Sequence, residues 1–303
     1  MATEAFIEIN FRQESLDRIA LVNMILGEYE RDGYDLSLRQ LYYQLVARDY
    51  IENSQRSYKN LGELVANARK AGLVDWNMIS DRNRSTVKNS HWDSPAEIVE
   101  AAARSFAIDK WEDQPWHIEV VVEKDALSGV LEPVCSKLDI RFTAAKGYPS
   151  VTLLHAMGKR LNHYSHRQLK DICIIHLADH DPSGVDMTRN LQNELSMYAG
   201  EEIEVVRLAL NMDQIETFNP PENPAKQSDS RFKKYQARFG DASWELDAIE
   251  PRNLAALVTD KVVELRDEDE WKQAVAREQA MRDELKKFVK SYKAKNGNGH
   301  KGN

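Results

Sequence analysis

Two short apolar runs, each followed by acidic residues, constrain the fold of this chain most strongly. Residues 118–122 and 172–177 are rich in β-branched side chains and contain neither proline nor glycine, which is typical of buried strands in a parallel sheet. Glu123 follows the first run, and Asp179 and Asp181 follow the second. Open α/β sheets bind their ligands at the carboxyl ends of strands, so we expect three carboxylates at one edge of a sheet.

The segments between and after these runs alternate between helical and strand patterns. We expect helices over residues 126–138 and 151–161, on either side of a strand over 140–144. A further helix and strand are expected over 184–198 and 203–208. This order of elements predicts an α/β fold with a mostly parallel, Rossmann-like sheet.

The three carboxylates point to a metal site. Like charges held close together repel strongly unless one is protonated or a cation bridges them. Mg²⁺ prefers oxygen ligands and leaves coordination positions for water and phosphate. In a D-x-D pattern the two side chains point the same way on an extended segment. We therefore predict Mg²⁺ ligation by Glu123, Asp179 and Asp181. The alternative is an Asp-rich turn into a helix, with Pro182 and Ser183 as turn and capping residues.

The first quarter of the chain has a different pattern, in which short amphipathic helices follow one another. Helices are expected over residues 14–29, 37–46 and 58–71. Ser37 is a suitable N-cap for the second helix, and Gly72 ends the third. An extended segment follows. This arrangement is typical of a helix-turn-helix or winged-helix (CAP-like) module that binds DNA.

The charge of this module differs from that of the whole chain. The net charge of the 303 residues is −8, but residues 31–92 carry ten Lys or Arg against seven Asp or Glu. Most of the local excess lies in 56–70 and 82–88. The predicted contacts to DNA phosphates are Arg56, Lys59, Arg69, Lys70, Arg82 and Arg84. The alternative is that these side chains form ordinary solvated helix faces.

An R-x-x-Y-Y sequence lies on the second predicted helix. Arg39 and Tyr43 are one turn apart and lie away from the leucine stripe, so we expect Tyr43 to point outward while Tyr42 joins the core. A guanidinium beside a phenol would favour the phenolate and could hold a phosphate for attack. On the pattern alone, a tyrosine pair that simply packs on an amphipathic helix remains the alternative.

Together these residues resemble a known family. A glutamate after one strand and a D-x-D after a later one are the pattern of the Toprim domain. The variant DHDPSG, with KGYPS over residues 146–150 upstream, is similar to the A subunit of topoisomerase VI and to the related meiotic double-strand-break transesterase. Those proteins also carry R-x-x-[FY]-Y in a winged-helix domain before the Toprim domain. The resemblance covers roughly residues 31–190.

The resemblance implies an enzyme of the type IIB topoisomerase A-subunit kind, a DNA isomerase that makes Mg²⁺-dependent double-strand breaks. Tyr43 would attack DNA to form a 5′-phosphotyrosine link, with Arg39 as its supporting cation. Glu123 would act in acid–base catalysis or contact the metal, which Asp179 and Asp181 would hold. The family further implies a homodimer in which each tyrosine acts beside the partner's metal. Lys124 and Lys146 are further candidate contacts to DNA, although Lys124 could also simply cap the end of its strand.

The chain departs from the family in two respects. It is shorter than the topoisomerase VI A subunits, and it contains no G-x-x-x-x-G-K-[ST] phosphate loop, so ATP-coupled strand passage would need a separate ATPase subunit. It more closely resembles the minimal Mini-A type of phages, plasmids and bacteria. Two alternatives stay open. One is a hydrolytic nuclease similar to the Wadjet plasmid-defence nuclease subunit, and the other is a DNA-binding regulator without catalysis.

Composition and patterning complete the predicted organisation. Apolar residues make up 42% and charged residues 30% of the chain, an ordinary globular balance. No leader pattern or long apolar run is present, so we expect a cytoplasmic protein that acts on intracellular DNA without a membrane. Cys135 and Cys173 are expected to be buried free thiols. The predicted parts are a winged-helix domain over 1–92, a helical connector over 93–115, a Toprim domain with an extension over 116–265, and a charged helix with a basic, disordered tail over 266–303.

Overall fold

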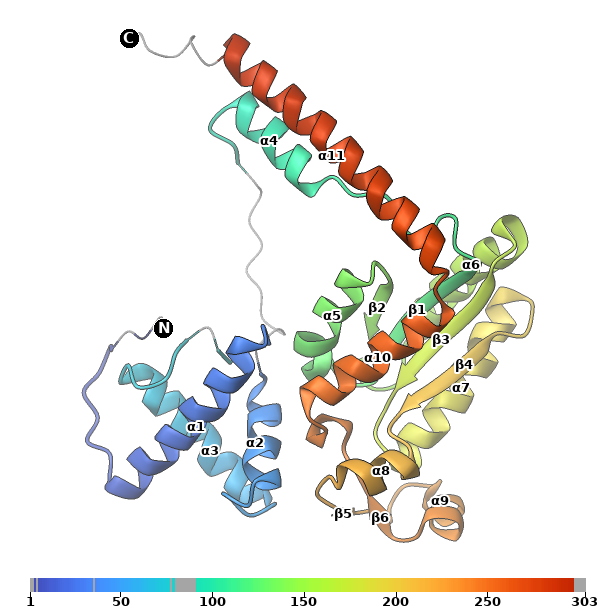
Figure 1. Ribbon diagram of the computed structural model, residues 1–303. Helices are drawn as coiled ribbons and strands as arrows, with labels where there is room; N and C mark the ends of the chain where they lie inside the picture. Colours follow the sequence, from blue (N-terminus) through green and yellow to red (C-terminus); the bar gives the residue numbers. More distant parts are fainter. Residues whose placement is uncertain (1–2, 4, 35, 77, 80–90, 297–303) are drawn as a thin grey trace.

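A parallel sheet of four strands lies at the centre of the protein. The computed structural model describes residues 3–296 apart from residues 4, 35, 77 and 80–90 (Figure 1). The strands are ordered β2-β1-β3-β4, and neighbouring strands are parallel. Their bounds are β1 Trp116–Val122, β2 Arg141–Ala144, β3 Asp171–Leu177 and β4 Glu204–Ala209. The α/β class and the predicted strands are thereby confirmed.

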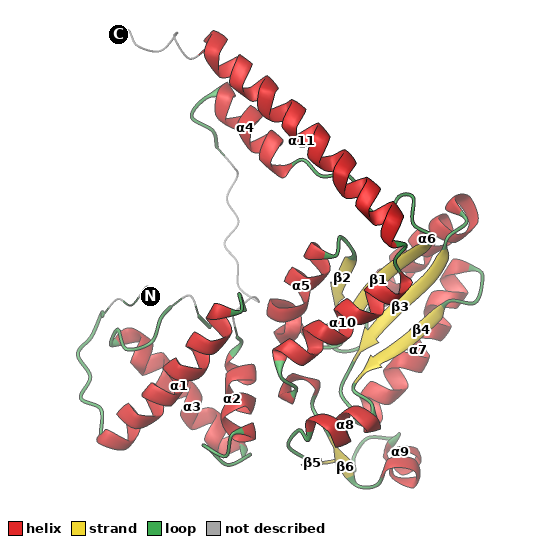
Figure 2. Ribbon diagram, viewed as in Figure 1, coloured by secondary structure: helices red, strands yellow, loops and turns green. Residues whose placement is uncertain are grey.

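Helices cover both faces of the sheet (Figure 2). The bounds of the four main covering helices are α5 Ser128–Lys137, α6 Val151–Gln168, α7 Pro182–Ala199 and α10 Pro251–Leu265. Val120 packs with residues of α5 and α10, whereas its neighbour Val121 packs with residues of α6 and α7. Successive side chains of a strand point to opposite faces, so a sheet covered on both sides needs the continuous apolar runs seen in the sequence.

Three helices form an N-terminal helical unit, in agreement with the sequence. They are α1 Gln13–Arg31, α2 Leu38–Ala47 and α3 Gln55–Lys70. Their buried side chains form one core, which Ala248 joins from the far end of the chain. Tyr34 packs against both this core and the core on the α5 and α10 face of the sheet. The helical unit is therefore docked on the sheet through apolar contacts.

The remaining elements surround this framework. They are α4 Pro95–Ser105, η1 Asp125–Leu127, α8 Met212–Phe218, β5 Asn223–Pro224, α9 Phe232–Phe239, β6 Ala242–Ser243, η2 Leu246–Ala248 and α11 Glu268–Asn296. Helices α4 and α11 run side by side as an arm that projects from the sheet (Figure 1). Cys135 and Cys173 are buried free thiols, as predicted. Among the described residues, none of the helices combines the length and apolar composition that a membrane crossing requires.

A buried ion pair ties β1 to α6. Glu119 is fully buried in the middle of β1, and Arg160 on α6 donates two hydrogen bonds of 2.7 Å to its carboxylate. His117 Nε2 lies 2.9 Å from the same carboxylate. Burial opposes ionisation, but the bonds with Arg160 and His117 outweigh it and lower the pKa of Glu119 below its usual value. Glu119 is therefore charged at neutral pH and depends on its partners.

Replacing Arg160 tests this dependence. Arg160→Ala leaves a buried carboxylate without its main partner, and the free energy of unfolding should fall by about 3–5 kcal/mol. The matched control is Arg141→Ala, because Arg141 lies 4.0 Å from the same carboxylate but is 53% exposed. That variant should lose less than about 1 kcal/mol. Urea unfolding measures both, and equal losses would contradict the central role of Arg160.

His176 predicts a dependence of stability on pH. It is fully buried on β3, and burial together with the charge of Arg207 lowers its pKa to about 3. In the unfolded chain the pKa returns to about 6.5, so the stabilising effect is complete above that pH and is lost as the pH falls. In His176→Gln, the slope of unfolding free energy between about pH 6 and pH 4 should be shallower by up to about 1.4 kcal/mol per pH unit. Urea unfolding at several pH values checks this, and an unchanged slope would contradict it.

Candidate functional site

The carboxyl ends of β1 and β3 meet at one edge of the sheet. Val122 and Leu177 are partners in the parallel register. Glu123 comes directly after Val122, and Asp179 comes two residues after Leu177, so both acids leave the sheet side by side. The backbone N–H of Asp179 donates a 3.2 Å hydrogen bond to the carboxylate of Glu123. The expectation that the two acidic strand ends lie close together is confirmed.

A third segment brings two more carboxylates to Asp179. Oxygen atoms of Asp179, Glu245 and Asp247, which we call the acid cluster, all lie within 4.8 Å of one another. The backbone N–H of Leu246 donates a 2.8 Å hydrogen bond to Asp179 and holds the turn η2 against the strand end. Asp247 is fully buried, and its Oδ2 lies 2.8 Å from Nε of Arg39. The acid cluster thus offers hard oxygen donors, and a cation that binds there has to compete with side-chain cations for them.

Two cationic side chains lie against the acid cluster. Lys124 Nζ is 2.7 Å from Asp179 and 3.4 Å from Asp247, and it also contacts Glu245. Arg39, which comes from α2, lies 2.9 Å from Glu245 and 2.8 Å from Asp247. These cations supply charge neutralisation of the kind that a bound metal ion would provide. They also connect the N-terminal helical unit to the sheet.

The pKa values of the cluster reflect this crowding. Burial raises the pKa of Asp179 well above its usual value, although Lys124 opposes the shift. At Glu245 burial is outweighed by Lys124 and Arg39, which lower its pKa. Burial would lower the pKa of Lys124, but the three carboxylates raise it. The negative charge of the cluster is therefore reduced by the raised pKa of Asp179 and by the ion pairs with Lys124 and Arg39. A bound divalent cation would take over both functions.

The donor set fits a hard divalent cation. Mg²⁺ commonly binds one or two carboxylates and keeps its other positions for water or phosphate oxygens. Asp179, Glu245 and Asp247 could hold such an ion, and the oxygen-rich set offers no sulfur or imidazole that would favour a softer metal. A metal at this edge would attract phosphate and neutralise charge that develops on it.

The structure distributes the three predicted ligands differently. Asp179 belongs to the acid cluster, whereas Asp181 caps α7 by accepting a 2.6 Å hydrogen bond from Gly184. Gly184 must lack a side chain, because a Cβ there would lie 2.2 Å from the carbonyl oxygen of Asp179. Burial and the charge of Asp181 raise the pKa of Glu123. Glu123 and Asp181 are thus neighbours of the acid cluster, and their role as metal ligands stays a prediction.

Sequence reasoning missed Glu245 and Asp247. They lie in the stretch WELDAIEP over residues 244–251, to which the sequence patterns assign no function. Their E-x-D spacing repeats the alternation of acids in D-x-D and precedes a proline at the start of α10. This repeated spacing is the signal that could have identified them.

Helix α2 carries Arg39 and Tyr43 to the acid cluster. The side chain of Ser37 and that of Gln40 form a capping box, which confirms the predicted N-cap and fixes where the helix begins. The guanidinium carbon of Arg39 lies 5.8 Å from the centre of the Tyr43 ring. The predicted pair of Arg39 and Tyr43 is therefore present, and Arg39 is directed to the acids around η2.

The expectation that Tyr43 points outward is wrong. Tyr43 is only 5% exposed and belongs to the core of the N-terminal helical unit, on a helix that also contacts η2. Burial, followed by the charges of Glu245 and Asp247, raises its pKa to about 12. The phenol is consequently protonated at neutral pH in this arrangement. Tyr42 is buried as expected, and its hydroxyl donates a 2.9 Å hydrogen bond to Asn53.

The predicted DNA contacts differ in their surroundings. Arg56, Lys59 and Lys70 are exposed on α3. Arg69 is engaged within the protein, since it donates a 3.0 Å hydrogen bond to the carbonyl of Ile79. Lys146 is 61% exposed and lies 3.6 Å from a carboxylate. The remaining two, Arg82 and Arg84, lie outside the described residues.

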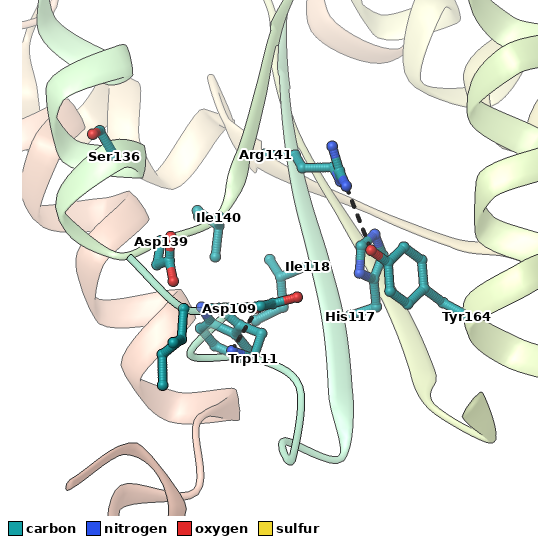
Figure 3. Close-up of a pocket in the computed structure, with 10 residues that line it drawn as sticks. Asp109, Trp111, His117, Ile118, Ser136, Asp139, Ile140, Arg141 and Tyr164 are labelled. Carbon is teal, nitrogen blue, oxygen red and sulfur yellow. Dashed lines mark hydrogen bonds between the residues drawn. The ribbon is translucent and has the colours of Figure 1, made fainter. Parts of the chain in front are cut away.

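A separate pocket of about 330 Å³ lies at the opposite edge of the sheet. Figure 3 shows His117 stacked on Tyr164, with ring centres 3.6 Å apart, and Arg141 reaching the tyrosine hydroxyl. These residues come from the amino ends of β1 and β2 and from α6. Ligands of open α/β sheets bind at the carboxyl edge, so this pocket is not part of the candidate site.

No protein-family model matches the chain, and no curated protein matches it at a significant level. The candidate site therefore stands on its geometry and chemistry.

Metal binding distinguishes the two possible sets of ligands. Asp247→Asn should weaken Mn²⁺ binding roughly tenfold or more if the acid cluster holds the ion. The matched change Asp181→Asn removes a carboxylate that caps α7 and should leave the affinity within about threefold. Lys124→Met should strengthen binding, because the competing ammonium is gone. Isothermal titration with Mn²⁺ measures all three variants. Loss of binding in Asp181→Asn alone would assign the ion to Glu123, Asp179 and Asp181 instead.

Proposed function

We propose that this chain cleaves double-stranded DNA by transesterification, with Tyr43 as the nucleophile and a divalent metal ion, Mg²⁺, as cofactor. The observation that supports this most is the placement of Tyr43 and Arg39 beside the acid cluster. A phenol, a guanidinium and a site suited to a hard cation are the groups that phosphoryl transfer to tyrosine requires. The resemblance to the topoisomerase VI A subunit implies the same arrangement, with winged-helix and Toprim domains.

In the proposed step, Tyr43 Oη attacks a phosphorus atom of the DNA backbone. The bond from phosphorus to the 3′ oxygen breaks, and a 5′-phosphotyrosine link remains. Glu123 accepts the phenolic proton, and the leaving 3′ oxygen takes up a proton from the surrounding water. Arg39 holds a non-bridging phosphate oxygen. A bound metal would supply Lewis-acid neutralisation of the phosphate at the acid cluster.

Cleavage requires the ion pairs between Arg39 and the acids around η2 to open, while α2 and α3 stay in contact with β5. In the closed arrangement Tyr43 is buried and protonated, and Arg39 is paired with carboxylates instead of phosphate. Phosphate groups of DNA would compete for Arg39, and a metal ion would compete with Lys124 for the acids. Once released, Tyr43 could act beside the cluster of its own chain or, in the homodimer implied by the resemblance, beside that of a partner. A separate ATPase subunit and action on intracellular DNA belong to this same proposal.

Burial of Tyr43 favours one alternative function, a metal-dependent hydrolytic nuclease. In that case water attacks the phosphate, and Tyr43 serves only to pack α2 against η2. Both functions use the acid cluster, so they differ in the nucleophile alone. The covalent state of the DNA ends separates them.

Cleavage of supercoiled plasmid in Mg²⁺ tests the proposal. Wild-type protein should leave protein-linked ends that enter a denaturing gel only after protease treatment. Tyr43→Phe should reduce cleavage by at least about a thousandfold, because it removes the nucleophile. The matched control Tyr42→Phe removes a neighbouring hydroxyl and should retain activity within about tenfold. Asp179→Asn should abolish cleavage by either route. Free ends together with an active Tyr43→Phe variant would establish hydrolysis.

A further inference from the structure

A cleft of about 670 Å³ opens beside Tyr43. Its walls come from α2, from the start of α3 and from the β5 segment, which belongs to the sheet part of the chain. The lining includes Tyr42, Tyr43, Asn53, Tyr58, Asn223 and Glu245, together with Arg39. The volume is within the range of small-molecule sites, and the lining combines aromatic rings with a few polar groups.

Aromatic rings form one side of the cleft. Tyr58 lies on the first turns of α3 and is 38% exposed. Its ring is supported edge-on by Tyr42 at 5.3 Å, and Tyr42 in turn contacts Tyr43 at 5.2 Å. A partly exposed ring that is held by a buried neighbour can stack on a flat ligand at little entropic cost. Stacking of a nucleobase on such a ring contributes about 1–3 kcal/mol.

Side-chain amides form the polar part of the cleft. Asn53 accepts the 2.9 Å hydrogen bond from Tyr42, and its Nδ2 donates a 3.0 Å hydrogen bond to Asn223. This second bond links the N-terminal helical unit to β5. An amide offers both donors and acceptors, which are the groups that the edge of a nucleobase can pair with.

The charged side chains of the cleft indicate which end would hold the phosphate of a bound nucleotide and which end would hold its base. Arg39 and Glu245 lie in its wall, and Glu245 also belongs to the acid cluster. A phosphate would therefore lie toward Arg39 and Tyr43, and the base would lie toward Tyr58. We propose that the cleft binds the nucleobase next to the phosphate that Tyr43 attacks, displaced from the DNA stack. This inference rests on the proposed function for the identity of that phosphate.

Direct nucleotide binding tests the cleft without any cleavage. The probes are the four 2′-deoxynucleoside 5′-monophosphates and base-free 2-deoxyribose 5-phosphate, with saturation-transfer NMR and titration calorimetry as readouts on the full chain. At least one nucleotide should bind, and the base-free compound should bind at least fivefold more weakly. Equal affinity for the base-free compound, or no nucleotide binding, would overturn the proposal.

Variants assign the binding to Tyr58. Tyr58→Leu should weaken nucleotide binding at least fivefold, whereas Tyr58→Phe keeps the ring and should bind the nucleotide as the wild type does. The matched control is Tyr50→Leu, since Tyr50 is 41% exposed in the same helical unit and does not line the cleft. Wild-type affinity in Tyr58→Leu would overturn the proposal.

Two further arms connect the cleft to DNA. A short DNA duplex should displace the bound nucleotide, and failure to compete would show a site for free nucleotides rather than for DNA. Sequencing of the plasmid ends should reveal a base preference next to the break. The Tyr58→Leu variant should lose this preference. If the plasmid stays uncut while the duplex still competes, nucleobase binding in the cleft is supported and the transesterase proposal fails. If cutting occurs with no base preference and no nucleotide binding, only the proposal of nucleobase binding in the cleft is overturned.

Discussion

The pairing of two cations with three carboxylates, two of them buried, holds the candidate site in its present form. Lys124 lies within 3.4 Å of Asp179 and Asp247, and Arg39 reaches Asp247 and Glu245 from another part of the chain. Taking these charges out of water costs free energy, which is recovered only while the partners stay together. The arrangement of α2, β3 and η2 at the site therefore depends on charge balance, and the apolar contacts around Ala248 and Tyr34 add to it.

The negative charge of the acid cluster can be compensated in two alternative ways. One uses Lys124, Arg39 and a raised pKa at Asp179. The other would use a divalent cation and the phosphate of a substrate. If Tyr43 is the nucleophile proposed above, a surface that stays closed until the cation and the phosphate bind would protect it from side reactions, because a buried phenol with a pKa of about 12 reacts poorly at neutral pH. Transesterification and hydrolysis would both use the acids, and only transesterification would use the tyrosine.

Local sequence patterns were sufficient for the framework of the fold. The β-branched runs identified β1 and β3, the acids after them marked the functional edge, and Ser37 identified the start of α2. What the sequence did not reveal comes from tertiary contacts. Glu245 and Asp247 lie around a short irregular turn that has no periodicity, and only the return of the chain brings them to Asp179. The burial of Tyr43 has the same origin, because the core that contains it also takes in Ala248 from η2, which the pattern of α2 alone does not show.

The turn η2 serves two purposes with adjacent residues. Asp247 points its carboxylate to the acid cluster, while Ala248 enters the core of the N-terminal helical unit. The geometry of the cation site and the docking of the helices consequently share one short piece of backbone. A ligand that undocks the helical unit and a cation at the acid cluster would therefore affect each other's binding. By thermodynamic reciprocity, each would change the affinity for the other by the same factor, and one coupling free energy would describe both effects.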